Sequence, residues 1–351
     1  MTEFITTLTA AATLESAVAA FIAAALLVWW AGSNLPRYVL ALCDRTGLGK
    51  GVAGMLVLGG ITSLPELATA TSAAAMGAPL LSLNNILGSA SFNILLLALA
   101  DMVLGARPLT SVVARPVTLI QGVLGVLLLG AVGAAIVAGG GERIGPVGAF
   151  STGIVALCVM AIAIANRSER RPMWQVVNPP DHARTGADRE TQQGLKPVVP
   201  ALLFLAALIL AGGFVLAASA EVIARKTGLG DGVVGFLFAA AATSLPELSA
   251  IVGSMRCQRY ELAVGEVFGS NLFNLAIIFV VDLAAPGPPV LRLAGNFEAL
   301  AALLALGMTG IFVLGLIERR NRTFIGMGED SLVAMCLYAA GTVYLFGMPA
   351  P

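Results

Sequence analysis

The hexapeptide Thr-Ser-Leu-Pro-Glu-Leu occurs twice in this chain, at residues 62–67 and again at 243–248. The similarity extends far beyond the hexapeptide. Residues 46–101 align without a gap with residues 227–282, at a constant offset of 181, and 20 of these 56 positions are identical. The identical pairs include the Gly-Ser and Phe-Asn dipeptides that follow the hexapeptide by about one helix length. The chain therefore contains an internal repeat.

The composition places this repeat in a membrane. Of the 351 residues, 58% are hydrophobic and only 11% are charged, and the mean hydropathy is +0.91. Soluble domains have about 25% charged residues, because their whole surface is in contact with water. A chain of this size with so few charges is expected to be an all-α integral membrane protein that is surrounded by lipid.

Polar or Gly/Pro-containing breaks divide the apolar sequence into ten segments, each near the length of about 20 residues that crosses a bilayer as a helix. The tight breaks at 77–79 and 255–260 predict antiparallel hairpins. One long polar stretch, residues 166–198, is expected to be a linker between two five-helix halves, residues 1–165 and 199–351. We expect the ten spans near residues 11–31, 53–76, 80–104, 117–139, 146–165, 199–222, 233–254, 262–285, 296–317 and 331–349.

The basic residues indicate an orientation. If both termini lie outside a cell membrane, 16 of the 20 Lys and Arg residues fall on the inside, and the 166–198 linker is cytoplasmic. This distribution agrees with the excess of positive charge on cytoplasmic loops. Five spans, an odd number, separate the two repeat copies, so the copies have opposite orientations. Inverted repeats are typical of secondary transporters, whose substrates bind near the midplane.

Glu66 and Glu247 fall in the middle of predicted spans, where a carboxylate is costly and usually marks an ion or proton pathway. The preceding prolines, Pro65 and Pro246, each remove a helical N–H and free backbone carbonyls nearby. A protonated glutamate in a helix–helix hydrogen bond, and a simple proline kink, are the structural alternatives. The oxygen donors expected around the two glutamates are the hydroxyls of Thr62, Ser63, Thr243 and Ser244 and the carbonyls of Gly59 and Ala240.

The next span of each copy carries a polar stripe at i, i+4 and i+8, which lies on one helix face. In the first copy the stripe is Asn85, Ser89 and Asn93, and in the second it is Glu266, Ser270 and Asn274. We expect both stripes to face the protein interior. Glu266 is a third intramembrane carboxylate, and ion binding, proton transfer and simple hydrogen bonding are all open to it. Asp101 and Asp282 lie near span ends, where an interface role is expected.

Other chemistries have little support in the sequence. The four cysteines (Cys43, Cys158, Cys257 and Cys336) are scattered, and His182, the one histidine, lies in the polar linker. No prosthetic group, nucleic acid or obligate protein partner is expected. An intramembrane enzyme with Glu66 and Glu247 as an acid–base pair would lack a nucleophile. A passive channel is a further alternative, although inverted repeats favour alternating access.

The two segments with TSLPE followed by GSxxFN resemble the α-repeats of the calcium/cation antiporter superfamily, in its sodium/calcium exchanger branch. This resemblance implies ten helices with the N-terminus outside, and ions bound by spans two, three, seven and eight. It implies alternating access, in which spans one and six slide across the other helices. The residues implied as ligands are Glu66, Glu247, Thr62, Ser63, Thr243, Ser244, Ser89, Asn93, Ser270, Asn274, Gly59 and Ala240.

The chain departs from the family pattern at several positions. Asn274 stands where sodium/calcium exchangers often have aspartate, Ala90 replaces the asparagine of GSN, and Glu266 replaces an asparagine. Two glutamates balance one Ca²⁺, which two or three Na⁺ or H⁺ could replace. Exchange of Na⁺ for Ca²⁺ is the first expectation. Exchange coupled to H⁺, as Ca²⁺/H⁺ or Na⁺/H⁺, is the alternative, although Leu67 and Leu248 occupy the places of the histidines of the proton/calcium branch.

Overall fold

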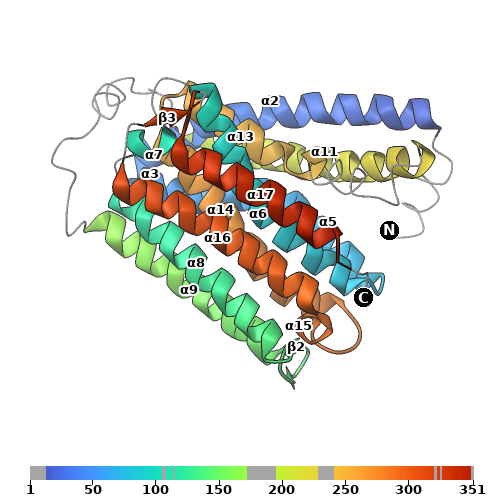
Figure 1. The fold of residues 1–351 in the computed structure, drawn as a ribbon. Helices are drawn as coiled ribbons and strands as arrows, with labels where there is room; N and C mark the ends of the chain where they lie inside the picture. Colours follow the sequence, from blue (N-terminus) through green and yellow to red (C-terminus); the bar gives the residue numbers. More distant parts are fainter. Residues whose placement is uncertain are drawn as a thin grey trace.

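The structure, a computed structural model, is built almost entirely of long apolar helices (Figure 1). It describes residues 13–104, 108–113, 115–171, 195–227, 241–319, 322–324 and 326–348. The helices of the first half are α2 (Leu14–Thr46), α3 (Lys50–Ala53), the π-helix η1 (Gly54–Leu58), α4 (Gly59–Thr62), α5 (Leu64–Ala75), α6 (Pro79–Leu104), α7 (Leu109–Val112), α8 (Pro116–Val137) and α9 (Ala149–Arg170). Those of the second half are α11 (Leu195–Thr227), α13 (Leu245–Arg256), α14 (Tyr260–Ala284), α15 (Val290–Leu293), α16 (Asn296–Glu318) and α17 (Glu329–Phe346).

Seven of these helices are long and apolar enough to cross a membrane, and the bent pair formed by residues 50–62 and 64–75 raises the number of candidate spans to eight. This finding within the described residues confirms an all-α multi-pass membrane protein. The two other expected spans coincide with α13 and α17. Part of the expected span 233–254 lies outside the described residues, so the count of ten remains a prediction.

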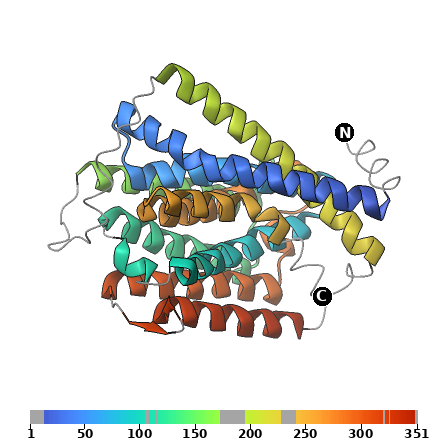
Figure 2. The same ribbon diagram turned by 90° about the horizontal axis from the view of Figure 1, so that it is seen from above.

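The helix that contains the first expected span extends beyond residue 31, because α2 continues to Thr46 and ends at Gly47 in a left-handed conformation. The polar residues after position 31 end the apolar run but not the helix. Pro36 is accommodated inside α2. The matching helix α11 has the same length of 33 residues. The two helices lie side by side and cross along one flank of the molecule (Figures 1 and 2).

The two predicted hairpins are confirmed. Helix α5 packs against α6 across the turn at Gly77, and α13 packs against α14 across the turn at Gln258. Gly77 has φ 86° and Gln258 has φ 55°. Both residues thus adopt the left-handed backbone conformation, which reverses the chain within a few residues. The hairpins hold each TSLPEL helix against the polar stripe that follows it in sequence.

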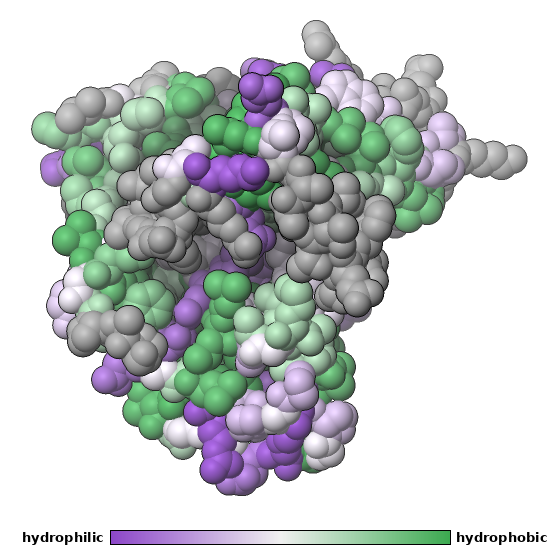
Figure 3. All heavy atoms as spheres, turned by 90° about the vertical axis from the view of Figure 1, so that its right-hand side faces the viewer, coloured by the Kyte–Doolittle hydropathy of each residue, from purple (hydrophilic) through white to green (hydrophobic). Residues whose placement is uncertain are grey.

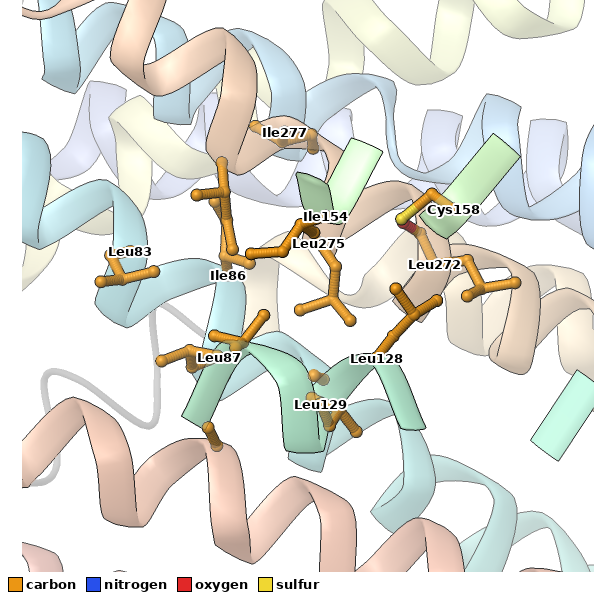
Figure 4. Packing of buried hydrophobic residues seen from close by; sticks show 14 of the residues in the cluster. Leu83, Ile86, Leu87, Leu128, Leu129, Ile154, Cys158, Leu272, Leu275 and Ile277 are labelled. Carbon is orange, nitrogen blue, oxygen red and sulfur yellow. The ribbon is translucent and has the colours of Figure 1, made fainter. Parts of the chain in front are cut away.

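The core lies between α6, α8, α9 and α14, where leucine and isoleucine side chains interdigitate (Figure 4). Leu87, Leu129 and Leu275 are each at most 1% exposed. On the outside, large apolar side chains such as Leu26, Leu127 and Val343 are exposed. Green, hydrophobic side chains also occupy much of the surface drawn in Figure 3. Apolar side chains on the outside of a multi-pass protein face lipid.

Two aspartates near the ends of spans, Asp282 and Asp101, form hydrogen bonds with the opposite half of the protein. Asp282, near the end of α14, accepts hydrogen bonds from Gly148 N (2.9 Å), Ser151 Oγ (2.6 Å) and Val290 N (2.7 Å). Gly148 ends the hairpin of β1 (Arg143–Ile144) and β2 (Val147–Gly148), and α9 begins directly after it. Asp282 therefore caps the N-terminus of a helix in the opposite half, where the helix dipole favours an anion.

Asp101 repeats this arrangement with the halves exchanged. It accepts hydrogen bonds from Leu109 N (2.5 Å) and Gly328 N (2.7 Å). Gly328 ends the hairpin of β3 (Thr323–Phe324) and β4 (Met327–Gly328), and α17 follows it. The role at the membrane interface that was expected for both aspartates remains a prediction, and the hydrogen bonds add a contact between the halves. The sequence did not indicate that each would bind the backbone of the other half.

Replacing Asp282 with alanine should destabilise the protein by about 2–4 kcal/mol, because it leaves buried backbone N–H groups without an acceptor. The measurement is thermal unfolding in detergent. Glu142→Ala is the control. Its exposed ion pair with Arg292 (3.1 Å) should contribute less than about 1 kcal/mol. Equal melting temperatures for the two variants would contradict the capping role of Asp282.

Candidate cation-binding site

The first TSLPEL segment breaks a membrane helix. Helices α4 and α5 meet at an angle of 45°. The break falls at Ser63, whose φ of −80° and ψ of 1° leave the helical region, and Pro65 lies in the first turn of α5. Pro65 lacks the N–H that would bond the Ile61 carbonyl, so the expected interruption is confirmed. Ser244 in the second copy has nearly the same backbone angles, φ −88° and ψ 10°.

A turn of π-helix, η1, directly precedes this break. Its sequence carries no direct signal for a π-helix, and the glycines in and beside it are the only signal of close packing. A Cβ added to Gly59 would lie 2.5 Å from Ser270 N, and one added to Gly269 would lie 2.3 Å from the Met55 carbonyl oxygen. Only glycine permits such a contact, so the backbones of η1, α4 and α14 touch. Short π-helical segments are frequent at functional sites.

Glu66 and Glu247 occupy matching places in the first turns of α5 and α13. Their side chains are 1% and 0% exposed. The N-terminal end of a helix carries partial positive charge, which stabilises a carboxylate there. The broken helices thus hold two buried acids where the repeats meet.

Ser270 links the acids to both halves. Its hydroxyl donates to Glu247 Oε1 (3.2 Å) and lies 2.8 Å from the Ser63 hydroxyl. The Asn93 amide nitrogen also approaches Ser270 Oγ, at 3.4 Å. Since Ser63 and Asn93 belong to the first repeat and Ser270 and Glu247 to the second, the predicted ligands converge from both copies.

Thr62 connects the break to the third acid. Its hydroxyl lies 3.0 Å from Glu266 Oε1 and 3.3 Å from the Gly59 carbonyl oxygen. The Gly59 carbonyl also accepts the Ser63 N–H at 3.1 Å. The carbonyl therefore keeps a helical hydrogen bond, contrary to the expectation that proline frees it, because the break at Ser63 preserves this bond. Its second lone pair can still face an ion when the Thr62 hydroxyl donates to Glu266. Ala240 lies outside the described residues.

Many oxygens of this cluster are buried without a hydrogen-bond partner. An unpaired buried polar group costs about 1–3 kcal/mol, so most native polar groups are paired. Unpaired carboxylate, hydroxyl and amide oxygens that lie together in the interior are what a cation-binding site requires, because the cation is their partner. The unpaired atoms are both carboxylate oxygens of Glu66, one each of Glu247 and Glu266, the hydroxyls of Ser89 and Ser244, Asn93 Oδ1, and both amide atoms of Asn274.

The structure places the other predicted residues unevenly. Thr243 is buried near the second break, and Ser89 and Asn274 are buried on the polar stripes, whereas Asn85 is only half-buried. Among the described residues, no three or more His, Cys, Asp or Glu side chains are grouped closely enough to hold one metal ion. Any ion here would need neutral oxygens as well as the acids. Hard oxygen donors of this kind suit Ca²⁺ and Na⁺.

Asn271 was missed by the sequence analysis. Its amide nitrogen donates to the Ala90 carbonyl (3.0 Å), and its amide oxygen accepts from Asn93 (3.1 Å). Asn271 and Ala90 occupy equivalent repeat positions, so these positions meet at the symmetry axis between the halves. The loss of the asparagine at Ala90 was the available signal.

Comparison with known proteins decides the family. The sequence profile described as "Sodium/calcium exchanger protein" matches residues 16–165 and 198–347. The chain belongs to this family. Both matched segments contain one TSLPEL copy, so the profile recognises both repeats.

This exchanger-family chain also resembles individual proteins. It is 28% identical over 307 residues to the putative antiporter CaxA of Alkalimonas amylolytica, covering 84% of this chain and 90% of the relative. It is 28% identical over 292 residues to the inner membrane protein YrbG of Escherichia coli K12, covering 81% and 82%. A solved structure of the sodium-calcium exchanger NCX_Mj matches with a TM-score of 0.70 at 19% identity, covering 94% and 99% of the two chains. The fold and family together define a multi-pass cation antiporter, which is a secondary transporter.

Proposed function

We propose that this exchanger-family protein exchanges Na⁺ for Ca²⁺ by alternating access, with the ions bound between the two TSLPEL segments. The observation that carries the proposal is the set of unpaired buried oxygens around Glu66 and Glu247. Two ionised carboxylates balance one Ca²⁺, and the hydroxyls and amides supply the further oxygens of the about 6–8 that Ca²⁺ takes. The proposed ligands are Glu66, Glu247, Thr62, Ser63, Thr243, Ser244, Ser89, Asn93, Ser270, Asn274 and the carbonyls of Gly59 and Ala240. Glu266 is proposed as a further ion ligand that lies outside the set that balances Ca²⁺.

The contacts of α2 and α11 support the moving part of this proposal. Gly32 of α2 and Gly213 of α11 are equivalent positions in the two halves. A Cβ on Gly213 would lie 2.4 Å from Pro65 Cγ, and one on Gly32 would lie 3.1 Å from the Pro246 carbonyl oxygen. Each helix therefore lies against the broken helix of the opposite repeat. A smooth glycine surface at this contact suits sliding of the α2–α11 pair across the site.

The counter-ion is tested with purified protein in liposomes that are loaded with either Na⁺ or an acidic buffer. We expect ⁴⁵Ca²⁺ uptake to follow an outward Na⁺ gradient at constant pH. Uptake that ignores the Na⁺ gradient and follows the pH gradient would replace the proposal by H⁺-coupled exchange. The carboxylates make this alternative chemically reasonable, since a carboxylate can take up a proton in place of a metal ion.

We further propose that the protein lies in the cell membrane with both termini outside and the 166–198 linker in the cytoplasm. The support is the distribution of Lys and Arg between the loops. A protease added to sealed inside-out vesicles should cut within 166–198. Cleavage there only in right-side-out vesicles would reverse the orientation.

A further inference from the structure

Glu266 is the one acid of the cluster that the repeat does not duplicate. Its equivalent in the first copy, Asn85, is neutral and half-buried, whereas the Glu266 side chain is fully buried. The symmetric part of the site, Glu66 with Glu247, does not need this residue. A buried carboxylate that breaks the symmetry of a repeat is expensive in a membrane and indicates a function of its own.

Only one of the two carboxylate oxygens of Glu266 has a hydrogen-bond partner. Oε1 accepts the Thr62 hydroxyl at 3.0 Å, and Oε2 is buried without any hydrogen-bond partner. No Lys or Arg side chain in the described part of the chain is buried, so none of them neutralises Glu266 inside the protein. The open oxygen is therefore available to a cation.

The position of Glu266 separates it from the symmetric pair. It lies one helical turn before Ser270 on α14, on the side toward Tyr260, and Ser270 is the residue that contacts Glu247. The three acids form no group close enough to share one metal ion. Glu266 nevertheless lies beside the same break, because it accepts the hydroxyl of Thr62, the residue directly before Ser63. The Gly59 carbonyl oxygen is also close, at 3.3 Å from the Thr62 hydroxyl.

We propose that Glu266 is a specificity-determining ligand that gives this protein one extra subsite for a monovalent hard cation, Na⁺, beside the Glu66–Glu247 pair. The ligands are Glu266 Oε2 and the Thr62 hydroxyl oxygen, which keeps a lone pair when its proton points to Glu266. One carboxylate balances one Na⁺, so the full site takes one more positive charge than the symmetric pair alone. The inference rests on the proposed function, because it assumes that Glu66 and Glu247 hold the Ca²⁺.

The test counts ions by their effect on stability. An ion that binds only the folded protein stabilises it in proportion to the logarithm of its concentration, with a slope set by the number of ions bound. Thermal unfolding is measured in detergent without Ca²⁺ while NaCl replaces choline chloride at constant ionic strength. In Glu266→Gln the number of Na⁺ ions obtained from this slope should fall by about one, and ⁴⁵Ca²⁺ should bind within about twofold of the unsubstituted protein. Glu142→Gln, which removes an exposed carboxylate, should change neither value.

The possible failures are distinguishable. An unchanged Na⁺ slope in Glu266→Gln overturns this inference and leaves the proposed function intact. Loss of ⁴⁵Ca²⁺ binding in Glu266→Gln also overturns it, because Glu266 would then belong to the Ca²⁺ site itself. Full ⁴⁵Ca²⁺ binding in Glu66→Gln would instead contradict the proposed function. If Glu266→Gln does not fold, Tl⁺ soaked into crystals of the unsubstituted protein replaces the variant. An anomalous peak beside Glu266 supports the subsite, and peaks only elsewhere overturn it.

Discussion

Glu66→Gln and Glu247→Gln should each lower ⁴⁵Ca²⁺ uptake into proteoliposomes by about 100-fold or more. Even residues that only support a metal ligand contribute about 10- to 100-fold to affinity or activity, so a charged ligand should contribute at least as much. Each change keeps the size of the side chain and removes one of the two charges that balance Ca²⁺. Because both carboxylate oxygens of Glu66 and one of Glu247 have no hydrogen-bond partner, the neutral amide should not destabilise the fold.

The matched control for these variants is Glu142→Gln, which makes the same chemical change at an exposed loop position. It should retain uptake within about twofold, since exposed ion pairs contribute little. Melting temperatures are compared in parallel to show that the variants are folded. Substantial ⁴⁵Ca²⁺ uptake by either folded variant would show that the substituted glutamate is not a ligand of the site.

Gly269→Ala should abolish transport and destabilise the protein by about 1–3 kcal/mol, the usual cost of overpacking a core. The added methyl group would lie 2.3 Å from the Met55 carbonyl oxygen, which is backbone and cannot rotate away. Helix α14 would be pushed from η1, and Ser270 would move with it. Because Ser270 contacts Glu247 and Ser63, the displacement would open the site.

Gly310→Ala is the control for this change. Gly310 is also helical, in α16, but an added Cβ would meet nothing within 4 Å. Alanine is the better helix former, so this variant should be as stable as the unsubstituted protein or slightly more so. We compare ⁴⁵Ca²⁺ uptake and melting temperature between the two variants to test whether the η1–α14 contact is needed for transport and stability. A Gly269→Ala protein with normal stability and transport would show that the η1–α14 contact is looser than the structure indicates.

The sequence was a good guide to residues whose chemistry is unusual for their surroundings. Glutamates in apolar spans, prolines before them and polar residues at helical spacing all indicated a site, and the structure brings Thr62, Ser63, Asn93 and Ser270 together with the acids. The repeat also predicted matching effects of Pro65 and Pro246 on their helices, and the structure places a break before each proline, at Ser63 and Ser244. These features depend on local backbone chemistry and on the cost of burying polar groups.

Features that depend on contacts between distant segments were not predictable. The extension of α2 beyond its apolar run was not predictable, because a helix can continue past the membrane through polar residues, which hydropathy does not detect. The π-helix and the cross-caps by Asp101 and Asp282 result from packing between the halves. Likewise, Pro65 predicted a Gly59 carbonyl without a hydrogen bond. The helix instead breaks at Ser63, two residues before the proline, and the Ser63 N–H still donates to the Gly59 carbonyl.

The central claim is that one divalent cation binds between Glu66 and Glu247 where the two repeats meet. Crystals soaked in Sr²⁺, a Ca²⁺ analogue with a strong anomalous signal, test it directly. We expect one dominant peak within about 3 Å of carboxylate oxygens of both glutamates, a little beyond the usual Ca²⁺–oxygen distance. A dominant peak elsewhere in the membrane region, with none between these two residues, would contradict the account.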